Sequence, residues 1–197
     1  GRAKTPDEFR EQMPFIKEML EAQGIRHYEL VNYEADDIIG TLANKVDKDE
    51  FDVVVLSGDR DLTQLATDTV KVDITVKGVS DIESYTPEHI AEKYDGLTPK
   101  QIIDMKGLAG DTSDNIPGVT KIGEKTAIKL LKQYGSVEGV YENIDEMKKS
   151  KMKENLINDK EQAFLSKRLA TIEVNAPVEV NVEDLAYEGK NLEKLVP

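Results

Sequence analysis

The sequence predicts an α/β fold: a parallel-sheet core with flanking helices, followed by a long helical region. Between residues 5 and 86, segments with the apolar spacing of helices alternate with short runs rich in β-branched residues, an order typical of parallel α/β cores. From Pro87 to about Thr171, helical spacing and helix start signals continue almost throughout. We therefore expect an α/β core over residues 1–86, a helical region over residues 87–175, and an extension over residues 176–197 that returns to the core.

The first predicted element is a helix from about Thr5 to Gly24. Thr5 can cap its N-terminus, Pro6 suits the first helical position, and Glu8 completes a capping box. Gly24 is typical of the residue that follows a helix end. Between these signals, apolar residues recur at helical spacing: Phe9, Met13, Ile16, Met19 and Leu20.

Apolar periodicity and turn residues predict the remaining elements. In chain order they are a strand over 25–31, a helix over 34–46, a buried strand over 52–56, a short helix over 61–66, a hairpin of strands over 70–76 and 79–85, helices starting at Thr86-Pro87 and Thr98-Pro99, and a last strand over 177–182.

Two aspartates follow the expected buried strand at its carboxyl end. Ser57 and Gly58 turn the chain there, and Asp59 and Asp61 come directly afterwards with Arg60 between them. Open α/β sheets bind their ligands at this end of the strands. Two acids with a single basic neighbour indicate a cation site.

Two further acidic groups lie elsewhere in the sequence. Glu34, Asp36 and Asp37 stand at the start of the second expected helix, and Asp111 and Asp114 lie in a polar segment after a later helix. If the fold brings the three groups together, seven carboxylates share one site, and a hard ion such as Mg²⁺ or Mn²⁺ relieves their repulsion. The alternative is that each group only caps a helix or turn, because acids are favoured at helix N-termini.

The glycine-rich segment over residues 115–127 is a candidate phosphate site. Gly118 and Gly123 bracket a tight turn, and the helix that follows carries three lysines: Lys125, Lys129 and Lys132. Free N–H groups at a helix start, with glycines that permit close approach, bind phosphate without reading sequence. A plain helical hairpin with solvated lysines is the alternative. A P-loop is disfavoured, because an extra residue separates the second glycine from the lysine and no strand precedes the segment.

Composition excludes several classes of protein. The chain has 197 residues, a net charge of −13, no Cys and only two His, which argues against disulfides, thiol chemistry, histidine-based zinc sites and Ser-His-Asp triads. No apolar run reaches the roughly 20 residues that span a membrane and no signal peptide opens the chain, so we expect a cytoplasmic protein. The negative charge disfavours nucleic acid as a partner unless acids gather around metal ions while lysines occupy a separate face.

Three motifs together resemble the 5′ nuclease domain of bacterial DNA polymerase I, which is similar to the flap endonucleases and phage 5′ exonucleases. They are residues 33–37 (Tyr-Glu-Ala-Asp-Asp), 57–62 (Ser-Gly-Asp-Arg-Asp-Leu) and 110–119 (Gly-Asp-Thr-Ser-Asp-Asn-Ile-Pro-Gly-Val). Residues 118–132 resemble the helix–hairpin–helix element of that family, and the likeness covers nearly the whole chain in the same order. The resemblance implies a PIN-like 5′ nuclease fold.

The resemblance also implies roles for single residues. The seven acids would hold two divalent ions, Mg²⁺ or Mn²⁺, near the scissile phosphate: Glu34, Asp36, Asp37, Asp59, Asp61, Asp111 and Asp114. Four of them are the expected catalytic residues: Asp36, Asp37, Asp59 and Asp61. The hairpin would grip duplex DNA through Gly118, Lys121, Gly123, Lys125, Thr126 and Lys129. A monovalent cation such as K⁺ would lie near the backbone carbonyls of Gly118, Val119, Ile122 and Gly123.

The sequence departs from the family pattern at its start. The family opens with a strand that bears an Asp-Gly-Asn type motif, and a second strand supplies another metal-binding Asp. Neither is present here, and neither is much of the arch through which the free 5′ strand passes. We therefore expect a 5′ nuclease fold that is incomplete at its N-terminus and whose sheet exposes apolar edges.

These inferences predict metal-dependent hydrolysis of phosphodiester bonds in 5′-flap or nicked DNA during replication and repair. The enzyme would be a structure-specific 5′→3′ exonuclease or flap endonuclease, fused to or acting with a DNA polymerase. One alternative is a DNA-binding module that holds duplex DNA without cutting it. Another is a metal phosphatase or a calcium-binding acidic domain, although no EF-hand loop occurs. The sequence leaves the oligomeric state open.

Overall fold

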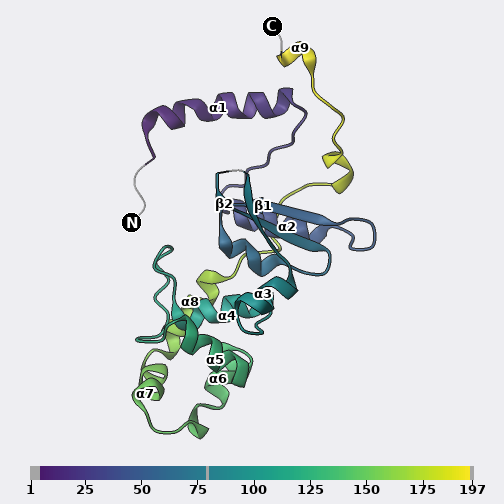
Figure 1. Ribbon diagram of the computed structural model, residues 1–197. Helices are drawn as coiled ribbons and strands as arrows, with labels where there is room; N and C mark the ends of the chain where they lie inside the picture. Colours follow the sequence, from purple (N-terminus) through teal and green to yellow (C-terminus); the bar gives the residue numbers. More distant parts are fainter. Residues whose placement is uncertain (1–4, 79, 196–197) are drawn as a thin grey trace.

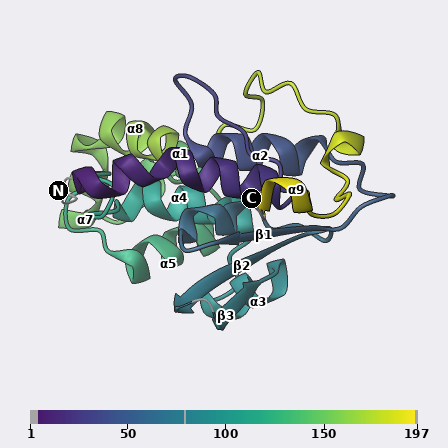
Figure 2. The same cartoon turned by 90° about the horizontal axis from the view of Figure 1, so that it is seen from above.

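The molecule, a computed structural model that describes residues 5–78 and 80–195, is built in three layers. Figure 1 shows α1 across one end with α9 near it, a small sheet with α2 in the middle, and helices α3 to α8 gathered toward the opposite end. From above, α1 runs across α2 and α4 (Figure 2). The helices and strands are α1 (Asp7–Ala22), α2 (Ala35–Lys45), β1 (Val53–Ser57), β2 (Val70–Lys77), β3 (Asp81–Tyr85), α3 (Pro87–Lys93), α4 (Pro99–Ala109), α5 (Glu124–Tyr134), α6 (Val137–Glu142), α7 (Lys151–Asn158), α8 (Lys160–Ala170) and α9 (Leu192–Leu195). Short 3₁₀ helices are η1 (Arg60–Leu65), η2 (Ile144–Glu146) and η3 (Val182–Leu185).

The sheet confirms the α/β class, and it is mixed rather than wholly parallel. The strand order is β1-β2-β3, with β1 parallel to β2 and β2 antiparallel to β3. Val70, Val72 and Ile74 of β2 point into the core, while the residues between them are partly exposed. The half-buried strand predicted for this segment is therefore confirmed, and the hairpin turn accounts for the antiparallel pair.

The prediction that β1 is a buried strand is only half right. Val55 is buried, whereas Val54 and Leu56 are 58% and 63% exposed. The reason is that β1 lies at an edge of the described sheet and only one of its faces packs on the core. The exposed apolar side chains of β1 therefore lie on the face of the strand that the core does not cover.

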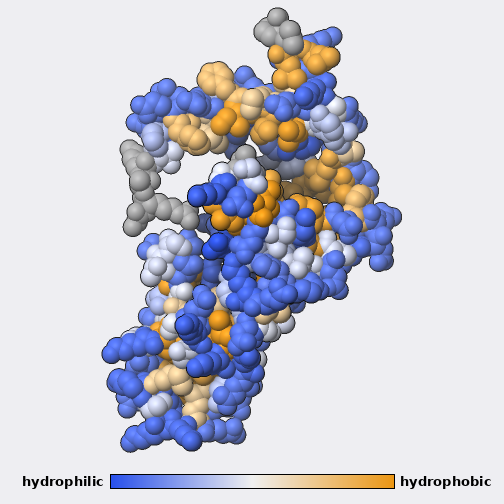
Figure 3. All heavy atoms as spheres, in the orientation of Figure 1, coloured by the Kyte–Doolittle hydropathy of each residue, from blue (hydrophilic) through white to orange (hydrophobic). Residues whose placement is uncertain are grey.

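Helix α1 forms as predicted, but its expected cap does not. The helix begins at Asp7, so Pro6 instead of Thr5 takes the cap position, and no side chain caps the helix. Its apolar residues stay exposed, Phe9 at 52% and Phe15 at 67%. Figure 3 shows apolar residues along α1 above an opening that separates the helix from the body of the molecule.

The strands predicted over residues 25–31 and 177–182 are wrong. Neither segment pairs with a strand among the described residues. In the second, alternation reflects packing against α2: Ala176 and Val178 are buried, the Ala176 N–H donates to Thr41 Oγ1 at 3.0 Å, and Lys45 Nζ donates to the Val178 carbonyl at 2.7 Å. The alternation of buried and exposed residues in this segment thus arises because it packs along a helix, and not because it is a strand of a sheet.

The helical region from α3 to α8 is confirmed, and its cap signals hold. Thr86 Oγ1 accepts the His89 N–H at the start of α3. Thr98 and Gln101 form a full capping box on α4. Helix α4 packs against α5, α8 and η1, so it joins the strand side of the molecule to the helical side. No helix in the described part of the chain is both long and apolar enough to cross a membrane.

A carboxylate on β3 fastens the sheet to α3. Glu83 accepts hydrogen bonds from Lys93 Nζ at 2.7 Å, from the Tyr85 hydroxyl at 3.0 Å, and shares one with His89 Nε2 at 3.0 Å. Hydrogen bonds from Lys93 and His89 outweigh the opposing effect of burial and lower the pKa of Glu83 to about 2.

The free energy of unfolding should depend on the charge of Glu83. Because the pKa falls from 4.5 unfolded to about 2 folded, the stabilisation is complete above about pH 5 and is lost as the pH falls towards 2. Glu83→Gln should lower the stability at pH 7 by roughly 1–2 kcal/mol. In urea titrations, the gap between variant and parent should narrow below about pH 5. Glu161→Gln on the exposed face of α8 is the matched control, and a gap that does not change with pH would contradict the prediction.

Candidate active site

Three segments far apart in the sequence bring their acids to the carboxyl end of β1. The turn after β1 leads into η1, where Asp59 Oδ1 accepts the Asp61 N–H at 2.9 Å and so caps the 3₁₀ helix. Helix α2 supplies its N-terminus, and the loop after α4 supplies the third segment. The predicted convergence of the three acidic groups is therefore found, with one exception described below.

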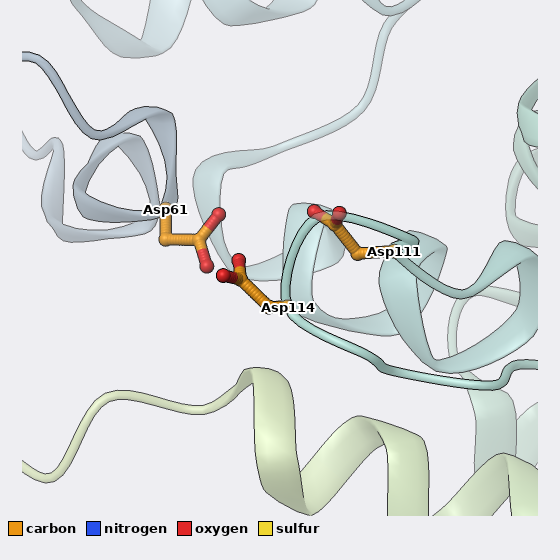
Figure 4. Close-up of side chains that lie close together, drawn as sticks. All are labelled: Asp61, Asp111 and Asp114. Atoms are coloured by element: carbon orange, nitrogen blue, oxygen red, sulfur yellow. The ribbon is translucent and has the colours of Figure 1, made fainter. Parts of the chain in front are cut away.

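Three carboxylates lie close enough to share one ion. Ligand oxygens of Asp61, Asp111 and Asp114 all lie within 4.8 Å of one another. Figure 4 shows Asp61 facing Asp114, with Asp111 beside Asp114 on the same loop. Hard oxygen donors at this spacing suit Mg²⁺ or Mn²⁺.

The acids line two adjoining hollows, each about 500 Å³ in size. The first, here called the lysine hollow, has a volume of 530 Å³, and its acidic lining residues are Asp59, Asp61, Asp111, Asp114 and Glu124. The second, the α2 hollow, has a volume of 460 Å³ and is lined by Glu34, Asp36, Asp59, Asp61 and Asp114. The two hollows share three carboxylates, so an ion in either hollow would be bound in part by the same residues.

Like charges crowd the α2 hollow. Burial, together with the charges of Asp59, Glu34, Asp37 and Asp114, raises the pKa of Asp36. Nothing in the local helix geometry requires this repulsion. A group of carboxylates held together in this way fits divalent cations, which remove the repulsion.

Asp37 is placed differently from the other six acids. Its Oδ2 accepts the Glu34 N–H at 3.1 Å in the capping box of α2, and its Oδ1 accepts the Glu173 N–H at 3.0 Å. It lines neither hollow. In this geometry Asp37 fixes the start of α2 and the segment after α8, and so holds Asp36 in place.

Lys106 brings a positive charge into the acidic cluster. Its Nζ donates to Asp61 and, at 3.0 Å, to Asp111 Oδ2, and its side chain is only 13% exposed. Burial opposes ionisation of Asp111, but hydrogen bonds from Ser113 and Lys106 lower the pKa of Asp111 to about 2. Asp111 is thus held as a carboxylate.

Two glycines lock the acidic loop to the hairpin. Gly110 and Gly118 both have positive φ, at 73° and 62°. A Cβ on Gly118 would lie 2.2 Å from the Gly110 nitrogen, and one on Gly110 would lie 2.6 Å from the Ile116 carbonyl. No side chain fits at either position, so the backbone that carries Asp111 touches the backbone of the hairpin directly.

Helices α7 and α8 fix the hairpin through side chains that bind its backbone. The Gly118 N–H donates to Ser166 Oγ at 2.9 Å, and Gln162 Nε2 donates to the Gly118 carbonyl at 2.6 Å. The Thr120 N–H donates to Asp159 Oδ2 at 2.8 Å, and Asn155 Nδ2 donates to the Thr120 carbonyl at 3.0 Å. Lys121, with φ of 59°, is held in a strained conformation that Lys rarely adopts.

The predicted DNA-binding lysines lie on the outside of this hairpin. Lys121, Lys125 and Lys129 are exposed and make no ion pair with any residue that the structure describes. Lys132 instead pairs with Asp95 at 2.8 Å. Gly123 caps α5 without a side chain, Thr126 is half-buried in its first turn, and both stay predicted contacts.

Three of the four carbonyls proposed for K⁺ already accept a hydrogen bond, that of Gly118 from Gln162 Nε2. Val119 accepts from Ile122, and Gly123 from Ala127. Each carbonyl keeps a second lone pair, so the K⁺ site stays a prediction.

Lys106 and the hairpin anchors were not predicted. A lysine in the last turn of α4 is ordinarily explained by the helix dipole, so its sequence context does not distinguish it. Gln162 and Ser166 lie one turn apart on α8, more than 40 residues from the glycine that they bind. No local pattern reveals such a contact.

The comparisons with known proteins agree with this geometry. Residues 1–95 match the family model of the 5′-3′ exonuclease N-terminal resolvase-like domain, and residues 97–193 match that of the 5′-3′ exonuclease C-terminal SAM fold. DNA polymerase I of Streptococcus pneumoniae R6 is 63% identical over 195 residues, which cover 99% of this chain and 22% of that protein. DNA polymerase I of Bacillus subtilis 168 is 63% identical over 196 residues, with coverage of 100% and 22%. The chain thus spans about a fifth of the length of these relatives.

Solved structures share the fold. The T5 D15 protein co-crystallized with metal ions aligns with a TM-score of 0.71 at 23% identity, covering 88% of this chain and 64% of that one. The catalytic core of Rad2 in complex with DNA substrate aligns with a TM-score of 0.60 at 19% identity, covering 96% and 65%. Since the two family models together span nearly the whole sequence, the chain belongs to the 5′-3′ exonuclease family, in the region that it has in common with bacterial DNA polymerase I.

Proposed function

We propose that this chain hydrolyses phosphodiester bonds in 5′-flap or nicked DNA, as a structure-specific 5′→3′ exonuclease or flap endonuclease that depends on divalent metal ions. The observation that carries the proposal is the convergence of three separate acidic segments on two adjoining hollows, beside a hairpin with exposed lysines. Bringing so many carboxylates together without a bound cation would be unfavourable, because like charges repel. A metal-dependent nuclease makes use of such a site.

The ions would be held by oxygen ligands from six acids: Glu34, Asp36, Asp59, Asp61, Asp111 and Asp114. Asp37, through its two backbone hydrogen bonds, would position them. When bound, Mg²⁺ or Mn²⁺ would supply Lewis-acid chemistry to the attacking water, the phosphate and the departing oxygen. In the reaction, the water oxygen bonds to phosphorus and gives up a proton to solvent, the bond from phosphorus to the 3′ oxygen breaks, and the leaving 3′ oxygen takes up a proton from solvent.

Other residues of the protein would position the carboxylates and hold the DNA. Lys106 keeps Asp61 and Asp111 ionised and in place. The hairpin would hold the duplex backbone by Lys121, Lys125 and Lys129, without reading bases. In this scheme residues 1–86 carry most of the acids and residues 87–175 hold the duplex. The described part of the extension, residues 176–195, returns along α2 and the end of α1, as the hydrogen bond from the Asn191 N–H to the Ala22 carbonyl supports.

The biological setting follows from the relatives. They are bacterial DNA polymerases I, of which the chain matches 22%. We propose that the nuclease acts beside a polymerase on the same DNA during replication and repair, in the bacterial cytoplasm.

Removing one acid should abolish cleavage without unfolding the protein. Asp59→Asn and Asp61→Asn keep side-chain size, and Asn also caps helices well. Each should lower Mg²⁺- or Mn²⁺-dependent cleavage of an end-labelled 5′-flap duplex by about 100-fold or more. Asp145→Asn on the exposed η2 is the matched control. If the parent chain binds the flap in a gel but yields no product, it is a DNA-holding module instead.

Reversing charge on the hairpin should weaken DNA binding in a salt-dependent way. Lys121→Glu with Lys125→Glu removes two phosphate contacts, so the slope of log affinity against log salt should become shallower by about two. Fluorescence anisotropy with duplex DNA measures both quantities. The pair Lys148→Glu with Lys149→Glu carries the same charge change on exposed residues elsewhere. Equal slopes in the two double variants would refute the role of the hairpin.

Removing Lys106 should raise metal affinity. Its ammonium group competes with a divalent ion for Asp61 and Asp111, so Lys106→Met should bind Mn²⁺ severalfold more tightly. Titration followed by the EPR signal of free Mn²⁺ measures this, with Lys151→Met, which loses only a surface pair with Glu154, as the control. Weaker binding in Lys106→Met would mean that the lysine orders the carboxylates instead of competing with the ion.

A further inference from the structure

Arg60 holds a second positive charge at the lysine hollow. It lies between Asp59 and Asp61 in η1, yet the site described above gives it no part. It and Lys106 are the two basic residues that line this hollow, and the Arg60 side chain is 56% exposed whereas Lys106 is nearly enclosed. Lys106 is committed to carboxylates, so Arg60 is the cation of this hollow that a ligand can reach.

Arg60 is turned away from the acids on either side of it. Its Nη2 lies 3.8 Å from Glu83 Oε2 on β3, and within the described residues its guanidinium makes this one ion pair and no hydrogen bond. An arginine that serves only to tie two elements together ordinarily forms a bidentate, hydrogen-bonded pair at shorter distance. Arg60 therefore keeps most of its five donors for another group.

Glu83 cannot neutralise Arg60 by itself, because it is already occupied. Lys93, His89 and Tyr85 all direct hydrogen-bonding atoms at its two oxygens. Lys93 alone balances the charge of Glu83. Glu83 thus lies beside the guanidinium without cancelling its charge, and the hydrogen bonds from Lys93, His89 and Tyr85 hold Glu83 in place on β3.

The ligand that fits this arrangement is a phosphate of a nucleic-acid backbone. Asp59, Asp61, Asp111, Asp114 and Glu124 line the same hollow, and the four aspartates mark where the bond to be cut would lie. Successive phosphates of a strand each carry a negative charge, and an acidic site repels those that no ion covers. Arg60, which lines the same hollow, provides the missing attraction, and its planar fork matches phosphate oxygens.

We propose that Arg60 binds the backbone phosphate next to the one that is cleaved, and that Glu83 is the positioning residue that directs it. The inference rests on the proposed nuclease function and adds to it a contact that sets which phosphate enters the acidic site. It predicts that Arg60 contributes to both affinity and the choice of bond.

The test compares Arg60→Gln, Arg60→Lys and Glu83→Gln with Arg168→Gln, an exposed arginine of α8. Anisotropy with a 5′-flap duplex in Ca²⁺ or EDTA, over a range of salt, gives affinity and slope. Arg60→Gln should lose about tenfold in affinity and make the salt slope shallower by about one. Arg60→Lys should retain the slope while losing part of the affinity, because the charge stays and the fork is lost.

Cleavage products in Mg²⁺ give a second readout that a purely structural tether would not move. In Arg60→Gln and Glu83→Gln, cuts should spread over neighbouring bonds, whereas Arg168→Gln should cut like the parent. Urea unfolding of each variant separates this effect from loss of stability.

The outcomes distinguish the inference from the function on which it rests. If the parent cuts at one bond and Arg60→Gln matches it in slope and product pattern, the inference fails and the nuclease stands. If the parent binds but does not cut, the nuclease function fails for this chain, and a shallower slope in Arg60→Gln still supports the phosphate contact. If the parent does not bind the flap, both are overturned.

Discussion

Repulsion among carboxylates at the end of β1 is the constraint on which the rest of this structure depends. Asp61, Asp111 and Asp114 place oxygens within 4.8 Å of one another. At an effective dielectric constant of about 20, each such ionised pair costs on the order of 3 kcal/mol, against a total stability of roughly 5–15 kcal/mol for a domain. Packing of α4 on η1 and α8, with the ammonium group of Lys106, keeps these charges together.

Separation of charge is what would allow so acidic a chain to bind DNA, as proposed above. The net charge of −13 is an average over two unlike surfaces. Acids fill the hollows beside β1, while exposed lysines stand on a hairpin whose shape is set by Ser166, Gln162 and the residues around them. The lysines need no buried partner, because the backbone beneath them is held by α7 and α8.

The sequence predicts which acidic groups meet, but it does not predict the residues that hold them in place. Helix caps at Thr86 and Thr98, the half-buried β2 and the meeting of the acidic groups all follow from local signals or from the family likeness. Contacts between distant residues do not. Glu173 holds Asp37, Lys106 bridges two segments, and residues 177–182 imitate a strand because they lie along α2. The periodicity of apolar residues indicates that one side of a segment is buried, but it does not indicate which element covers that side.

The contact between Gly110 and Gly118 fixes the distance between the acidic loop and the hairpin. The backbone after α4 leads to the acids on one side of this contact and to the lysine-bearing hairpin on the other. With no side chain between them, the two backbones touch directly, so this contact fixes the spacing between the hairpin and the acidic loop. In the proposed nuclease, this spacing would set the distance along the DNA backbone between the held duplex and the bond that is cut, and the identity of the bases would not enter.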